Sequence, residues 1–108
     1  MTHLLIYVRA GGCPDQAWTR RYLQEFGIKP IEVNISNQAD AAQTLIDLAG
    51  CLAVPTLVAA NDQGEPVEPP QPIEKGRSVR NVDRGSIISE PSRDGLQQFL
   101  IRHGFLPR

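Results

Sequence analysis

The chain has 108 residues, 11 Lys and Arg against 12 Asp and Glu, and 41% of its residues are hydrophobic. This length suits one domain, residues 1–108, with enough buried surface to fold without metal or disulfide staples. The two cysteines are too few for a disulfide framework or a four-thiolate zinc site, so we expect no bound metal. A net charge of -1 gives no general attraction to nucleic acid or to a membrane, and we expect neither as a partner.

The N-terminal residues lack the basic region and the small-residue cleavage site of a signal peptide. No apolar run approaches the roughly 20 residues that a membrane-spanning helix needs. We therefore expect a cytoplasmic protein, a compartment in which cysteines are kept as thiols.

Hydrophobic spacing predicts seven elements in the order β-α-β-α-β-β-α. They are expected at residues 4–8, 14–26, 31–35, 41–49, 56–60, 86–89 and 94–103. The first run is apolar throughout, which indicates a strand buried on both faces, whereas 31–35 alternates and predicts one buried face. Two right-handed crossovers would make the first three strands parallel, and the last strand would add an antiparallel edge. The expected architecture is a three-layer α/β/α domain with a four-stranded mixed sheet.

Residues 61–84 interrupt this alternation and predict a long surface loop or insertion before the last strand. The segment is polar and holds four prolines, and its end is basic, with Lys75, Arg77, Arg80 and Arg84. A short edge strand is expected around 66–73. Loops of this length within a compact domain are uncommon and are often functional. The basic end is either solvated or acts as a flap that contacts an acidic group of a substrate or partner.

Three short motifs stand at the ends of predicted strands or at the start of a helix. They are Arg9, Gly12-Cys13-Pro14 and Val54-Pro55-Thr56. In this order and on these elements, they resemble a glutaredoxin of the thioredoxin-like superfamily over about residues 3–60. The resemblance implies the thioredoxin-like, glutaredoxin-type version of the α/β/α fold.

The resemblance implies a role for each of these residues. Cys13 would be the nucleophile, because a helix N-terminus favours the thiolate over the thiol. Pro14 fits the first helical position, and Gly12 lets the backbone approach the sulfur. Arg9 stands where glutaredoxins commonly carry a lysine, which adds positive charge near the thiolate.

The remaining residues that the resemblance assigns would bind glutathione. Pro55 would be a cis proline, and Val54 would pair with the cysteinyl part of glutathione by strand addition. The alternative is that Pro55 only begins a strand. Asp94 stands near the helix N-terminus that holds the γ-glutamyl end in the family, although the family's Gly-Gly-x-Asp-Asp segment is degraded here to Ser92-Arg93-Asp94-Gly95.

The sequence departs from the family at Cys13-Pro14-Asp15-Gln16, where dithiol members carry Cys-Pro-Tyr-Cys. Without the resolving cysteine, only a monothiol route remains at this motif. A carboxylate at Asp15 would disfavour a neighbouring thiolate. Members that bind an iron–sulfur cluster carry Cys-Gly-Phe-Ser, so we expect no bound cofactor and take glutathione as a co-substrate.

Cys51 has two interpretations. It would be an unusual second thiol that pairs with Cys13 on oxidation, which requires Cα atoms within about 7 Å. Alternatively it is a small apolar residue after the helix that ends at Gly50, and we favour this interpretation.

Two functions follow. The first is a thiol-disulfide oxidoreductase that acts through Cys13 on glutathione or protein mixed disulfides. The second is a redox-inactive binding or regulatory domain that uses its long loop for partner contacts. Either would be a monomer or a homodimer.

Overall fold

The structure is a computed structural model in which residues 1–107 are described. Its elements are β1 (His3–Val8), α1 (Pro14–Glu25), β2 (Ile31–Asn34), α2 (Ala41–Ala49), β3 (Thr56–Ala60), β4 (Ile87–Ser89) and α3 (Arg93–Arg102). The predicted order of strands and helices is confirmed. Over residues 1–107, no helix combines the length and the apolar character that crossing a membrane requires.

The four strands form one mixed sheet in the order β2-β1-β3-β4. β2 is parallel to β1, while β3 is antiparallel to both β1 and β4. The expectation that the first three strands are all parallel is therefore wrong for β3. The chain leaves for α2 and returns from it at the same end of β1: Ser36 Oγ accepts from the Ala10 N–H, and the Val54 carbonyl lies beside Cys13. A chain that re-enters the sheet at the end where β1 stops must run back along it.

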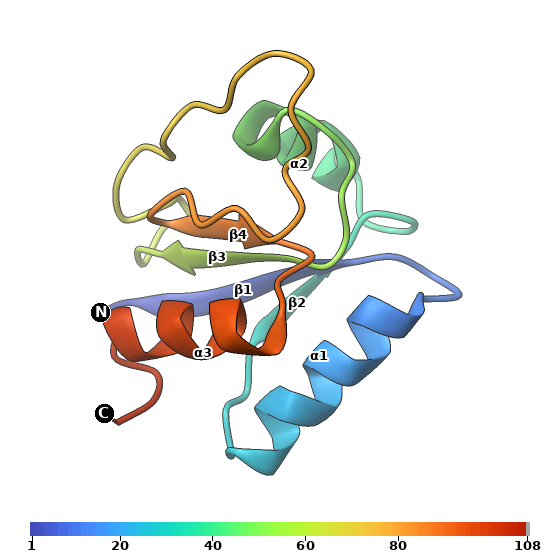
Figure 1. The fold of residues 1–108 in the computed structure, drawn as a ribbon. Coiled ribbons are helices and arrows are strands. Elements are labelled where there is room, and N and C mark those ends of the chain that lie inside the picture. Colours follow the sequence, from blue (N-terminus) through green and yellow to red (C-terminus); the bar gives the residue numbers. More distant parts are fainter. Residues whose placement is uncertain (108) are drawn as a thin grey trace.

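The helices cover the sheet as three layers, with α1 and α3 on one face and α2 on the other (Figure 1). Residues of α1 and α3 pack on one side of the sheet, and residues of α2 pack on the other. The central strands β1 and β3 are buried on both faces, as the unbroken apolar run predicts. β2 is an edge strand whose predicted buried face is covered only in part, since Ile31 at its start is 53% exposed.

The long loop between β3 and β4, residues 61–86, contains neither a helix nor a strand. The predicted edge strand around 66–73 is reduced to one bridge between Ala60 and Pro66, because prolines there cannot donate ladder hydrogen bonds. Further along, residues 80–84 turn back along the outer edge of β4. The Asn81 N–H donates to the Ser89 carbonyl at 2.8 Å, and the Arg84 N–H donates to the Ile87 carbonyl at 3.0 Å.

Arg84 fixes the end of this loop to the body of the domain. Its side chain is buried, at 8% exposure. The guanidinium donates to the Ala49 carbonyl and to the Gln71 carbonyl, both at 2.8 Å. Ala49 is the last residue of α2, where free carbonyls and the helix dipole favour a cation. The loop is therefore held against α2 and β4 over its final residues.

Candidate active site

Cys13 is the residue immediately before α1, with Pro14 at the first helical position. Its backbone is extended, and its carbonyl accepts the first helical hydrogen bond, from Ala17 at 3.0 Å. The sulfur is half-buried and stands at the N-terminus of α1, where free N–H groups and the helix dipole favour negative charge. This is the environment expected of a reactive thiolate.

The turn that precedes Cys13 is closed by Gln16. Its side chain is only 1% exposed, and its amide makes two hydrogen bonds to Arg9. Oε1 accepts from the Arg9 N–H at 3.0 Å, and Nε2 donates to the Arg9 carbonyl at 3.1 Å. Gly12 lies under this amide with φ +60, and a Cβ there would come within 3.2 Å of Nε2. Gln16 therefore fixes the shape of the loop that leads into Cys13.

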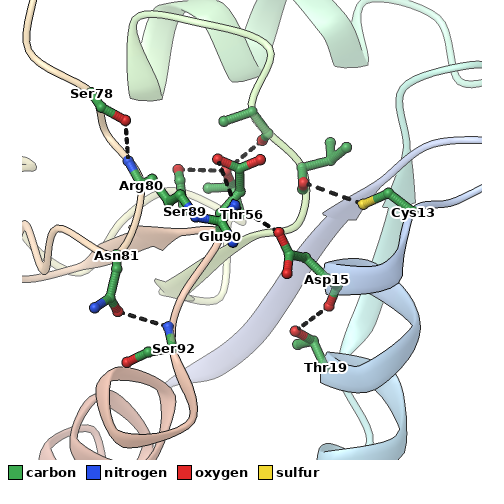
Figure 2. Close-up of polar contacts among 12 residues, drawn as sticks. Cys13, Asp15, Thr19, Thr56, Ser78, Arg80, Asn81, Ser89, Glu90 and Ser92 are labelled. Atoms are coloured by element: carbon green, nitrogen blue, oxygen red, sulfur yellow. Dashed lines mark hydrogen bonds and ion pairs between the residues drawn. The ribbon is translucent and has the colours of Figure 1, made fainter.

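The structure brings Cys13 and the Val54-Pro55 segment together. The Cys13 thiol faces the Val54 carbonyl, with an Sγ–O distance of 3.9 Å, and the Val54-Pro55 peptide bond is cis. Thr56 holds this segment in place, because its hydroxyl donates to the Ala53 carbonyl at 2.7 Å. Thr56 Oγ1 also lies 2.6 Å from the hydroxyl of Ser89 in β4 (Figure 2).

Asp15, in the first turn of α1, lies in an ion pair with the long loop. Arg80 Nη1 is 2.7 Å from Asp15 Oδ2 and 3.7 Å from Glu90 Oε2. Trp18 Nε1 donates to the other Asp15 oxygen at 3.3 Å. The hydrogen bond from Arg80 is the main reason that the pKa of Asp15 is lowered. The basic end of the loop thus contacts an acidic group, and that group belongs to the same chain.

The N-terminus of α3 is also occupied in part by the long loop. Ser92 caps this helix by accepting from the Gly95 N–H at 3.0 Å. Asn81 Oδ1 accepts from the Ser92 N–H at 2.7 Å and leaves no room for a side chain at Gly95. Asp94 is exposed in the first turn. An anionic group at the N-terminus of α3 would therefore find the Ser92 N–H already bound to Asn81.

The remaining predicted residues fall into two separate hollows. Arg9, Gly12 and Pro14 line one of about 630 Å³ together with Cys13. Cys51 is half-buried in another of about 640 Å³, between residues 49–53 and residues 73–79 of the loop. Both cysteines are free thiols, and pairing between them stays a prediction. Among residues 1–107 no group of three or more His, Cys, Asp or Glu is placed to hold a metal ion.

Sequence reasoning missed three residues of this site. In the sequence, Gln16 indicates only that the second cysteine of dithiol glutaredoxins is absent. No sequence pattern predicts that its amide hydrogen-bonds the backbone of Arg9. Arg80 belongs to the basic run at the end of the loop, for which a contact with an acidic group is one predicted role. Its partner Asp15 could not be predicted, because the two residues are 65 positions apart. Asn81 lies within the same segment and has no signal of its own.

Comparison with protein families finds a match to the N-terminal part of the chain. A family model described as Glutaredoxin matches residues 4–63, which is more than half of the chain and runs from β1 through β3. No curated protein and no solved structure matches the chain. The match covers Cys13, Gln16 and the Val54-Pro55 segment, and it assigns the chain a thiol redox role of the glutaredoxin kind. The chain belongs to the glutaredoxin family of the thioredoxin-like superfamily.

Proposed function

We propose that the chain reduces mixed disulfides by a monothiol route through Cys13, with glutathione as co-substrate. One observation carries this proposal. The sulfur of Cys13 stands at the N-terminus of α1 beside the Val54 carbonyl, while Gln16, buried and bonded to Arg9, takes the place of a resolving thiol.

The proposed reaction has two exchanges. The Cys13 thiolate attacks the glutathione sulfur of a mixed disulfide; a Cys13–glutathione disulfide forms, and the substrate thiolate leaves and takes up a proton. A second glutathione thiolate then attacks the glutathione sulfur bound to Cys13, which releases oxidised glutathione and the Cys13 thiolate. The two electrons that reduce the substrate come from the two glutathione molecules. We place this reaction in the cytoplasm, where the glutathione pool supplies the reductant.

The backbone at Val54 supports binding of an extended peptide-like substrate. Its carbonyl faces Cys13, and a glutathione cysteinyl unit would pair with it as an added strand. Arg9 lines the same hollow as Cys13 and supplies a cation for a substrate carboxylate. At α3, by contrast, Asn81 already accepts a hydrogen bond from the Ser92 N–H, so we expect the γ-glutamyl end of glutathione to bind more weakly there.

The test is turnover of a glutathionylated peptide with glutathione in excess. Cys13→Ser is expected to abolish turnover, and Cys51→Ser, the matched thiol control, is expected to keep it near the wild-type rate. Loss of turnover in Cys51→Ser would contradict the monothiol route, because it would make Cys51 the resolving thiol. Full turnover in Cys13→Ser would contradict the whole proposal.

A redox-inactive binding domain, monomeric or homodimeric, is the second candidate. The contacts of Arg80 and Asn81 favour it, since both place loop residues where a substrate would approach α1 and α3. It predicts a folded wild-type protein with no turnover of any mixed disulfide. Measurable turnover that depends on Cys13 would remove this candidate.

A further inference from the structure

The charges around Cys13 present a conflict. Asp15 stands two residues after Cys13 in the first turn of α1, and a carboxylate in this position opposes a thiolate. Glu90 adds a second carboxylate from the end of β4, within reach of the same cation. Arg9 is one cation of this region, and it lines the same hollow as Cys13. The other cation is Arg80, which approaches from the long loop (Figure 2).

Arg80 is held in position by its neighbours along the loop. Its own N–H donates to Ser78 Oγ at 3.1 Å. The next residue, Asn81, is fixed twice: its N–H donates to the Ser89 carbonyl, and its side chain accepts from the Ser92 N–H. The guanidinium therefore extends from an anchored stretch of backbone, which keeps it close to Asp15.

The directions in which the pKa values of Asp15 and Arg80 are shifted agree with this geometry. The pKa of Asp15 is lowered, mainly by its hydrogen bond to Arg80. The pKa of Arg80 is raised, above all by Asp15, with smaller contributions from the negative charges of Glu90 and Cys13. The pair is thus ionised at neutral pH.

We propose that Arg80 is a positioning residue for the nucleophile: by pairing with Asp15 it cancels the one negative charge in the first turn of α1 and so preserves the Cys13 thiolate. This inference rests on the proposed function in that Cys13 reacts as a thiolate. By this inference, the end of the long loop influences the reactivity of Cys13 through Arg80.

The test measures how fast Cys13 reacts with iodoacetamide, a neutral reagent that Arg80 does not attract by charge. Cys51→Ser serves as the background, so that Cys13 is the only thiol. At low ionic strength and at a pH below the inflection of the alkylation rate, where only part of Cys13 is ionised, Arg80→Gln is expected to slow alkylation about three- to tenfold, since a nearby charge changes the thiolate fraction by this order. Arg80→Lys should retain most of the rate, and Asp15→Asn should raise it.

The double variant separates this mechanism from others. With Asp15→Asn present, Arg80→Gln is expected to change the rate by less than about twofold, because the first turn of α1 then holds no carboxylate for Arg80 to cancel. Arg77→Gln, another cation of the same loop, is the control and should leave the rate unchanged. An unchanged rate in Arg80→Gln would overturn the inference, as would an equal loss with and without Asp15.

The assay is independent of turnover. If the alkylation pattern holds while the protein reduces no mixed disulfide, the proposed function fails and the role of Arg80 stands. If turnover is normal and the alkylation rate does not depend on Arg80, the role of Arg80 is refuted while the proposed function stands. Far-ultraviolet circular dichroism of each variant checks that the fold is retained.

Discussion

Replacement of Gln16 by alanine removes the amide that closes the Cys13 loop. The side chain is 1% exposed and makes two hydrogen bonds, to the N–H and to the carbonyl of Arg9. Each bond contributes about 1 kcal/mol net, and truncation also leaves a void and an unpaired N–H. The Arg9 carbonyl keeps its bond from Gly12 at 3.3 Å, so the loss is not complete. We expect the free energy of unfolding to fall by about 2–3 kcal/mol, or roughly 8–20 °C in Tm.

Urea denaturation measures this loss as a lower midpoint with an unchanged slope. Gln24→Ala on the same helix is the matched control, because its side chain is exposed and its loss should cost less than about 0.5 kcal/mol. If Gln16→Ala costs no more than Gln24→Ala, the amide does not hold the loop and the reasoning is refuted. Gln16→Glu sharpens the test, since an ionised carboxylate would place a second acceptor against the Arg9 carbonyl.

Three further predictions concern the long loop. The lowered pKa of Asp15 means that its pair with Arg80 stabilises the fold above the ordinary value of 3.8 and loses this effect as pH falls through the lowered value. The stability difference between wild type and Asp15→Asn, followed by urea denaturation between pH 7 and 2, should therefore vanish in acid; a constant difference would contradict this. Arg84→Met removes the donor to the Ala49 carbonyl, in a buried contact, and to the Gln71 carbonyl, in a partly buried one, and we expect the free energy of unfolding from urea denaturation to fall by about 2–3 kcal/mol. A loss no larger than that of an exposed arginine would contradict the anchoring role. Asn81→Gly keeps the backbone, because φ is 58° there, and frees the N–H of Ser92, the N-cap residue of α3. Stability should fall by about 0.5–1 kcal/mol and KM for a glutathionylated peptide several-fold; an unchanged KM would mean that glutathione does not reach this helix.

The order of the elements, and each of their bounds to within one residue, follow from the sequence because burial imposes a period on each element. Residues 56–60 were predicted as a strand and form β3 at those bounds. The direction of β3 could not be predicted, because it depends on where the segment 50–55 re-enters the sheet. Periodicity describes which faces are buried, and it carries no information about which end of a neighbouring strand a connection reaches.

The candidate site divides in the same way. The resemblance to glutaredoxins predicts Cys13, Pro14 and the Val54-Pro55 segment as a group, because these motifs match the family in order and on the same elements. Gln16 and Arg80 could not be predicted, because their roles depend on contacts with a backbone turn and with a residue 65 positions away. Such contacts are set by tertiary packing and leave no local pattern.

The return of residues 80–84 along β4 also decides how a second chain can join the sheet. A strand edge with free N–H and carbonyl groups is a template for another strand, and here the Ile87 and Ser89 carbonyls of β4 already accept from Arg84 and Asn81 of the chain itself. The opposite edge, β2, is only four residues long, follows Pro30, and presents Glu32 paired with Arg20. A homodimer built by sheet extension would therefore have to form through β2, on the side away from the long loop.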